Sequence, residues 1–240
     1  MSSVILGYWD LRGLGQSIRL LLEQVGEKYE ETRYTLGNDL QKNEWRTIKT
    51  SSPLIIGGPG ESRMDFPNLP YYIETKADGS QLKLSQSVAI MRYLGEKHGL
   101  IPTSLEERAL LTVYEQEVTD LRAAICGYCY GGTFPHKFRF PNYVQDIRDV
   151  LKTWDQFLDK KQWIMGDLMT YVDFYLYEML DWHILLDKTI LDAFPNIASY
   201  SERIRKLPAI EAYMKSDRYI DWPLVSPLAP VWGSINHSKA

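Results

Sequence analysis

The chain opens with Val4-Ile-Leu-Gly-Tyr-Trp-Asp-Leu-Arg-Gly-Leu-Gly15, an apolar run of strand length followed by a glycine-rich turn. Residues 15–25 then repeat apolar side chains at helical spacing, and Gly26 stands where such a helix would end. Residues 29–34 are charged but β-prone, which is typical of a strand at the edge of a sheet. The opening stretch therefore predicts a strand, a helix and a second strand.

A turn signal and a further helix follow. Asp78-Gly79 lies between two short β-prone segments, 71–74 and 81–84, as in a β-hairpin. Residues 86–97 then place apolar side chains on one face of a helix. Strand, helix, strand, hairpin and helix is the order of a thioredoxin-like domain, in which helices pack on a four-stranded mixed sheet. We therefore expect an α/β, thioredoxin-like N-terminal domain over residues 1–98.

The second half of the chain has helical periodicity. Strand signals fade after residues 99–104, which we interpret as a linker. Helical spacing recurs in four segments: 105–130, 144–158, 171–186 and 198–206. We therefore expect an all-α C-terminal domain over residues 105–240. Within the first domain, the stretch 50–63 is rich in Gly, Pro and Ser, which predicts a surface loop.

Composition excludes several classes of function. The 240 residues carry 27 basic and 31 acidic side chains, a net charge of −4, with no dense basic run, so nucleic-acid binding is not expected. No stretch approaches the roughly 20 apolar residues that span a bilayer. The N-terminus lacks the basic start of a secretory signal, and the two cysteines are too few for a disulfide scaffold. We therefore expect a cytoplasmic protein.

Six separate motifs together resemble one family. Residues 5–14 resemble the opening strand and turn of the mu-class glutathione S-transferases, which are cytosolic enzymes with a thioredoxin-like and a helical domain. The other matching motifs are Asp65-Phe-Pro-Asn-Leu-Pro70, Ser85-Gln-Ser87, Tyr171-Val-Asp-Phe174, Ala212-Tyr-Met-Lys-Ser216 and Val231-Trp-Gly233. The resemblance implies a detoxification enzyme that conjugates reduced glutathione, its co-substrate, to small hydrophobic electrophiles. It also implies a homodimer that needs no other cofactor.

The resemblance implies that Tyr8 activates the glutathione thiol. A free thiol has a pKa of about 8.5, so little of the nucleophilic thiolate is present at neutral pH. A neutral tyrosine hydroxyl that donates a hydrogen bond to sulfur favours the thiolate. Without the resemblance, a tyrosine on a strand is more often a core residue. Tyr130 matches a second catalytic hydroxyl, on the electrophile side, whose alternative is an aromatic at a helix end.

The resemblance implies that the charged groups of glutathione meet partners from different segments. Gln86 and Ser87 are expected to hold the γ-glutamyl carboxylate, because the N-terminus of a helix favours an anion. An ordinary helix cap at Ser85 or Ser87 is the alternative. Asp120 matches the aspartate that reaches across the dimer to the ammonium group of the ligand, and a solvated helix face is its alternative.

The remaining glutathione contacts implied by the resemblance lie in two further segments and in the opening turn. Trp45 and Lys49 match contacts to the glycine carboxylate, although a Trp and a Lys in a polar stretch would be unremarkable alone. Leu69-Pro70 matches a segment with a cis peptide bond, where the Leu69 backbone pairs with the cysteinyl part of the ligand. The other implied contacts are Asn68, Trp9 and Leu14, and Val225 and Ser226 are candidate linings of the electrophile pocket.

Redox and metal chemistry are not expected. Cys126-Gly-Tyr-Cys129 would be a redox signature if it began a helix after a strand, but it falls late in a helical stretch. The four histidines, at positions 98, 136, 183 and 237, have no ligand spacing, so no metal site is expected.

Some features of the sequence leave alternatives open. Phe66 matches an aromatic key that inserts into the partner subunit.

The segment between Lys49 and Asp65 is longer than in the family pattern, and loops tolerate such insertions at little cost. A non-catalytic carrier of glutathione or of hydrophobic ligands, a structural protein and a glutathione-dependent isomerase would all share this fold.

Overall fold

The computed structural model describes residues 3–35, 43–58, 62–131 and 143–232. In these ranges the N-terminal part forms one four-stranded sheet in the order β2-β1-β3-β4. The strands are β1 Ser3–Trp9, β2 Glu30–Tyr34, β3 Tyr71–Thr75 and β4 Gln81–Ser85. β1 and β2 run parallel, whereas β3 is antiparallel to both β1 and β4. The predicted mixed sheet, with β2 at its edge and a hairpin from β3 to β4, is confirmed.

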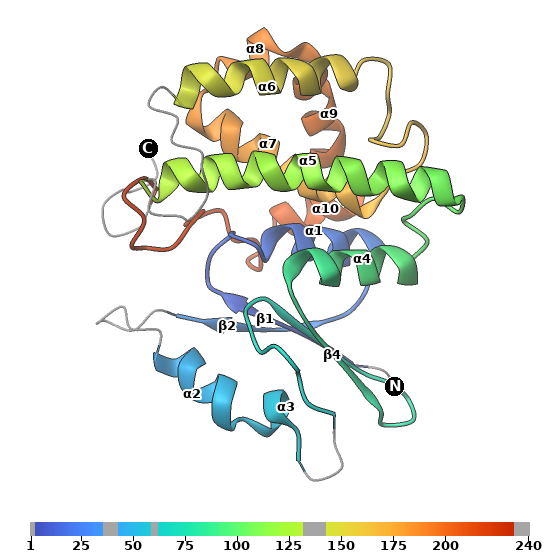
Figure 1. The fold of residues 1–240 in the computed structure, drawn as a ribbon, viewed down its shortest axis with the longest axis vertical. Helices are drawn as coiled ribbons and strands as arrows, with labels where there is room; N and C mark the ends of the chain where they lie inside the picture. Colours follow the sequence, from blue (N-terminus) through green and yellow to red (C-terminus); the bar gives the residue numbers. More distant parts are fainter. Residues whose placement is uncertain (1–2, 36–42, 59–61, 132–142, 233–240) are drawn as a thin grey trace.

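Helices flank both faces of this sheet (Figure 1). α1 (Gln16–Val25) and α4 (Ser87–Lys97) cover the face that is turned toward the helical part of the chain. α1 ends where Gly26 adopts a φ of 67°, the left-handed cap that the sequence predicted. α2 (Asn43–Ser51) and α3 (Pro53–Ile56) lie on the opposite face.

The prediction of a surface loop over residues 50–63 is wrong for its first half. α2 runs to Ser51, and α3 follows with Pro53 at its start and Gly57 at its end. The first turn of a helix leaves its N–H groups unpaired, so a proline there starts the helix instead of breaking it. Ile55 of α3 is fully buried, which a surface loop would not predict. Residues 59–61 of this stretch lie outside the described residues.

Aromatic packing holds α2 against the sheet. The Trp45 ring stacks on Tyr71 with ring centroids 5.9 Å apart and lies 5.5 Å from the ring of Tyr34. The Tyr71 ring also lies across Gly7 of the neighbouring strand, where an added Cβ would fall 2.1 Å from it. A glycine is therefore required at position 7 for the tyrosine to occupy this place.

The C-terminal part is helical throughout the residues that the structure describes. Its helices are α5 Leu105–Cys129, α6 Tyr143–Phe157, α7 Tyr171–Leu186, α8 Ile190–Ala193, α9 Pro195–Arg205 and α10 Pro208–Met214. The four predicted helices are confirmed, and the short helices α8 and α10 were not predicted. α7 begins with the Thr170 backbone N–H donating to the Asp173 carboxylate over 2.7 Å, which pairs an otherwise orphaned donor.

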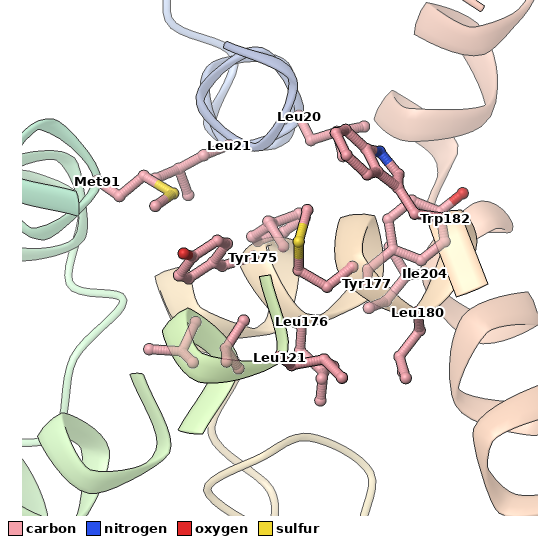
Figure 2. Close-up of a cluster of buried hydrophobic side chains, with 14 of the residues drawn as sticks. Leu20, Leu21, Met91, Leu121, Tyr175, Leu176, Tyr177, Leu180, Trp182 and Ile204 are labelled. Carbon is pink, nitrogen blue, oxygen red and sulfur yellow. The ribbon is translucent and has the colours of Figure 1, made fainter. Parts of the chain in front are cut away.

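The hydrophobic core is shared between the sheet domain and the helices. Figure 2 shows Leu20 and Leu21 of α1 and Met91 of α4 meeting Tyr175 and Trp182 of α7. All five side chains are at most 3% exposed. Each fully buried apolar side chain of this size stabilises the fold by about 1.5–3 kcal/mol, so this contact fixes how the two parts of the chain sit together.

The strand register brings the predicted site segments to one edge of the sheet. Trp9 at the end of β1 lies opposite Tyr34 at the end of β2. Tyr71 at the start of β3 lies opposite Gly7 of β1 and opposite Ser85 at the end of β4. The turn after β1, the segment before β3 and the start of α4 therefore emerge at the same edge.

Candidate active site

A cleft of about 150 Å³ lies between this sheet edge and the helical part. Four parts of the chain contribute to its walls: the end of β1 with the following turn, α5, α7 and a segment near the C-terminus. The lining residues are Tyr8, Trp9, Leu11, Gly13, Leu14, Arg122, Cys126, Tyr130, Met179, Trp182, Val225 and Ser226. The structure thus brings Tyr8, Trp9, Leu14 and Tyr130 together, although they come from distant parts of the sequence.

The Tyr8 hydroxyl is held in place by the turn that follows it. The backbone N–H of Leu14 donates a hydrogen bond to the Tyr8 oxygen over 2.9 Å. Gly13 lies against the same hydroxyl, since a Cβ at that position would be 2.5 Å from the Tyr8 oxygen. Because the oxygen is the acceptor in the Leu14 bond, its own proton remains available for a ligand atom.

Tyr8 is a neutral hydrogen-bond donor over the physiological pH range. Burial disfavours the phenolate and raises the pKa of Tyr8 to about 12, although the Leu14 N–H and the Arg19 charge act in the opposite direction. The Arg19 guanidinium lies 5.8 Å from the centroid of the Tyr8 ring. A phenol that keeps its proton can donate it in a hydrogen bond to a bound anion, which is the chemistry expected of a thiol activator.

Arg12 anchors the turn after Tyr8 to the helical part of the chain. Its side chain is 1% exposed and donates to both carboxylate oxygens of Glu178, over 2.9 and 2.7 Å. It also donates to Asp181 over 2.7 Å, and its backbone N–H donates to the Pro223 carbonyl. Since Glu178 and Asp181 lie on α7, a buried ionic network holds the turn in position. The sequence analysis missed this network, whose only signal is an arginine inside an apolar stretch.

Tyr130 stands on the α5 wall of the cleft. The backbone N–H of Ser226 donates to the Tyr130 oxygen over 3.1 Å. Burial raises the pKa of Tyr130, whereas the Ser226 N–H lowers it, and the net shift is upward. Tyr130 is therefore a second neutral hydroxyl in the cleft, and Val225 and Ser226 are linings of the cleft, as the sequence predicted.

Arg122 and Cys126 also line the cleft, and the sequence analysis gave neither a role in the site. They precede Tyr130 on α5 by eight and four residues, a spacing that places all three on one face of a helix. This spacing is the signal that could have identified them. Burial raises the pKa of the Cys126 thiol, which keeps it protonated.

The other predicted glutathione contacts do not line this cleft, and they lie on α2, before β3, at the start of α4 and on α5. Trp45 and Leu69 are each 6% exposed and share a buried cluster with Tyr8, and Leu69-Pro70 has the cis peptide bond that the resemblance implied. The exposed members of the predicted set are Lys49, Asn68, Gln86 and Asp120, and Ser87 is half-buried.

The start of α4 has an unusual backbone. Gln86 occupies the N-cap position with a φ of 73° and makes no side-chain capping bond. A positive φ is uncommon in residues other than glycine and is concentrated at functional sites. The Ser85 hydroxyl does not cap the helix either but donates to the Phe66 carbonyl over 2.6 Å. The first N–H groups of α4 therefore lack the ordinary serine cap that was the alternative interpretation.

The described residues hold two free cysteines and no cluster of metal-ligating side chains. Cys126 and Cys129 both lie on α5, and both are buried and unpaired by disulfides. In the described residues, no group of three or more His, Cys, Asp or Glu side chains could hold a metal ion. His136 and His237 lie outside those residues. No described helix has the length and apolar character needed to cross a membrane.

Comparison with known proteins identifies the family. The N-terminal domain of glutathione S-transferases matches residues 4–96, and their C-terminal domain matches residues 119–217. Glutathione S-transferase Mu 1 of Bos taurus is 41% identical over 233 residues, which are 96% of this chain and 99% of that protein. Glutathione S-transferase Mu 4 of Homo sapiens is 38% identical over 234 residues, 97% of this chain and 99% of that protein.

A solved structure agrees with these sequence relatives. The crystal structure of the glutathione S-transferase Blo t 8 has a TM-score of 0.74 and 30% sequence identity, over 95% of this chain and 99% of that one. The chain therefore belongs to the glutathione S-transferase family, and its thioredoxin-like and helical parts are those of this fold. Within the family, the relatives at 40–41% identity carry mu-class names, which confirms the class that the motifs predicted.

Proposed function

We propose that this chain is a glutathione transferase in which Tyr8 activates the thiol of bound glutathione for attack on hydrophobic electrophiles. The observation that carries the proposal is the Tyr8 hydroxyl at an apolar cleft, where its oxygen accepts from the Leu14 N–H and its proton has no acceptor among the described residues. Mu-class transferases, as their names state, act on glutathione, and this chain shares their fold over nearly its whole length.

The expected catalytic effect follows from one hydrogen bond. A bond to a charged acceptor contributes about 1.5–3 kcal/mol. Since one pKa unit corresponds to about 1.4 kcal/mol, Tyr8 would lower the pKa of the bound thiol by about one to two units. Such a shift brings the thiol pKa from about 8.5 to near neutral, where a large share of the ligand is the nucleophilic thiolate.

The proposed glutathione site extends from Tyr8 along the sheet edge. The uncapped start of α4 at Gln86 and Ser87 offers backbone N–H groups to the γ-glutamyl carboxylate. The cis Leu69-Pro70 segment adjoins it across the β3–β4 pair, because Tyr71 lies opposite Ser85. Trp9 and Leu14 line the cleft beside Tyr8. The remaining proposed contacts are Trp45, Lys49, Asn68 and, from the second subunit, Asp120.

We also propose the assembly and setting that the resemblance implied. Phe66 is 80% exposed although it is a large apolar side chain, and Ser85 fixes its backbone carbonyl, which fits an aromatic key that inserts into a partner. Asp120 is exposed on α5, as a residue that reaches across a homodimer must be. A cytoplasmic role in detoxification, with residues 1–98 binding glutathione and residues 105–240 completing the electrophile side, fits this arrangement.

Tyr130 is proposed as the second catalytic hydroxyl. It is neutral and lines the cleft, which fits a hydroxyl that donates a hydrogen bond to an oxygen of the electrophile. Its contribution depends on the electrophile, because only additions to epoxides or enones place negative charge on such an oxygen.

The test is glutathione conjugation to a chlorodinitrobenzene by wild type, Tyr8→Phe and the matched control Tyr177→Phe. The Tyr177 hydroxyl is buried and has no hydrogen-bond partner in the described part of the chain, so its removal should leave turnover unchanged. Tyr8→Phe should lose about tenfold to hundredfold in kcat/KM at neutral pH. Wild-type binding of glutathione without turnover would favour the non-catalytic carrier, and undiminished Tyr8→Phe activity would refute the mechanism.

A further inference from the structure

Arg122 places a positive charge in the wall of the electrophile cleft. It lies on the same face of α5 as Cys126 and Tyr130, and all three line the cleft. Its Nε–H donates to the Tyr175 hydroxyl over 3.0 Å, which holds the side chain on the side of α7.

Among the described residues, no carboxylate pairs with Arg122, unlike the other arginines near the site. Arg12 is paired with Glu178 and Asp181, and Arg19 with Glu31 over 2.6 Å. In the described part of the chain Arg122 forms no ion pair, and no carboxylate side chain lines the cleft. The guanidinium therefore lies at an apolar cavity, and none of its five donors contacts a carboxylate in the described part of the chain.

The surroundings of Arg122 favour an anionic ligand group. A charge beside apolar walls such as Met179 and Trp182 is poorly solvated, which strengthens its attraction to an opposite charge. A guanidinium matches a carboxylate with two parallel hydrogen bonds. The apolar walls would hold the hydrocarbon part of the same molecule.

We propose that the cleft selects electrophiles that carry a carboxylate, which Arg122 binds while the apolar walls hold the ring or chain and Tyr8 orients the glutathione sulfur. This inference rests on the proposed function and names its substrate class. In the test reaction with an aryl chloride, the sulfur of glutathione forms a C–S bond to the ring. Chloride leaves with the electron pair of the C–Cl bond, and the thiol proton passes to solvent.

The experiment compares two electrophiles that differ in one group. A chlorodinitrobenzoate and the corresponding chlorodinitrobenzamide share the reacting ring, so charge that develops on the nitro groups affects both alike. The readout is the ratio of their kcat/KM values, each divided by its uncatalysed rate with glutathione. Wild type should favour the acid. In Arg122→Met the ratio should fall by about tenfold to hundredfold, the effect of losing a hydrogen bond to a charged group.

Two further variants separate binding of the carboxylate from a structural role. Arg122→Lys keeps the charge but loses the paired donors, so its ratio should lie between those of wild type and Arg122→Met. Arg108→Met makes the same change on the same helix, but Arg108 pairs with Glu96 outside the cleft, so its ratio should equal that of wild type. An equal loss with both electrophiles, or a raised KM for glutathione with an unchanged ratio, would overturn the inference and leave the transferase reaction standing.

The inference also has a readout that does not need turnover. Calorimetry with the two preformed aryl conjugates of glutathione measures binding alone, and wild type should bind the acid conjugate more tightly than the amide by about tenfold or more. If neither electrophile is turned over but this difference is found and is lost in Arg122→Met, the proposed catalysis fails and the carboxylate site stands. Equal binding of the two conjugates refutes the carboxylate site.

Discussion

Replacement of Arg12 by methionine should destabilise the protein strongly. Arg12 makes three charge-assisted hydrogen bonds to two buried carboxylates of α7, Glu178 and Asp181. Without it, the donor that Glu178 keeps among the described residues is the Trp182 Nε1–H at 2.8 Å, whereas Asp181 keeps Arg205. Removing one partner of a buried ion pair costs about 3–5 kcal/mol. Because Asp181 retains a cation, we expect a loss near the lower end, about 3 kcal/mol.

Urea unfolding of Arg12→Met, followed by tryptophan fluorescence at one protein concentration, measures this loss. Adding Glu178→Gln to the Arg12→Met variant removes the carboxylate charge that lost its partner, so the double variant should recover part of the lost free energy of unfolding. Lys206→Met breaks an exposed pair with Glu202 at 3.1 Å and should change the free energy of unfolding by about 0.5 kcal/mol or less. If Arg12→Met were no more destabilising than Lys206→Met, the buried network would not hold the two parts together.

Two shorter predictions concern the cleft and the helical core. Gly13→Ala puts a methyl group 2.5 Å from the Tyr8 oxygen at a φ of 42°, so kcat/KM should fall by about tenfold to hundredfold, and an unchanged rate would show that this oxygen is not critically placed. The His183 Nδ1–H donates to the Met179 carbonyl, Nε2 pairs with the Tyr143 hydroxyl, and burial lowers the pKa of His183 from 6.5 to about 4. Its contribution to stability is therefore present above pH 6.5 and is lost as the pH falls toward 4. This shift of roughly 2.5 pKa units corresponds to about 3 kcal/mol. Urea unfolding measured between pH 7 and pH 4 should therefore find this loss in the free energy of unfolding of wild type but not of His183→Gln.

Local sequence signals were sufficient for the sheet and for the long helices. The apolar run before Tyr8, Gly26 after α1 and Asp78-Gly79 in the hairpin each act through neighbouring residues, so they could be interpreted without the fold. The failures have physical reasons. α2 has few apolar residues and depends on Trp45 packing against Tyr34 and Tyr71, which lie elsewhere in the sequence. Pro53 was taken for a breaker, although proline is favoured in the first turn of a helix.

The candidate site was predictable only in part, for a similar reason. Tyr8, Trp9 and Leu14 are close in sequence, and a resemblance was sufficient to predict that they line one cleft. Arg12 and Glu178 are 166 residues apart in the sequence, and no local pattern predicts such a contact. Arg122 could have been found, because its spacing to Cys126 and Tyr130 follows one face of a helix. That it has no carboxylate partner in the described part of the chain becomes visible only when the fold places it in the cleft.

The most direct test of the account is the ionisation of the glutathione thiol in the complex. The ultraviolet absorbance of the thiolate, followed as a function of pH with glutathione bound, reports the pKa of the bound thiol in wild type and in Tyr8→Phe. The account predicts a wild-type value about one to two units below that of free glutathione, and a return toward the free value in the variant. The same titration curve in both proteins would contradict the claim that Tyr8 activates the thiol.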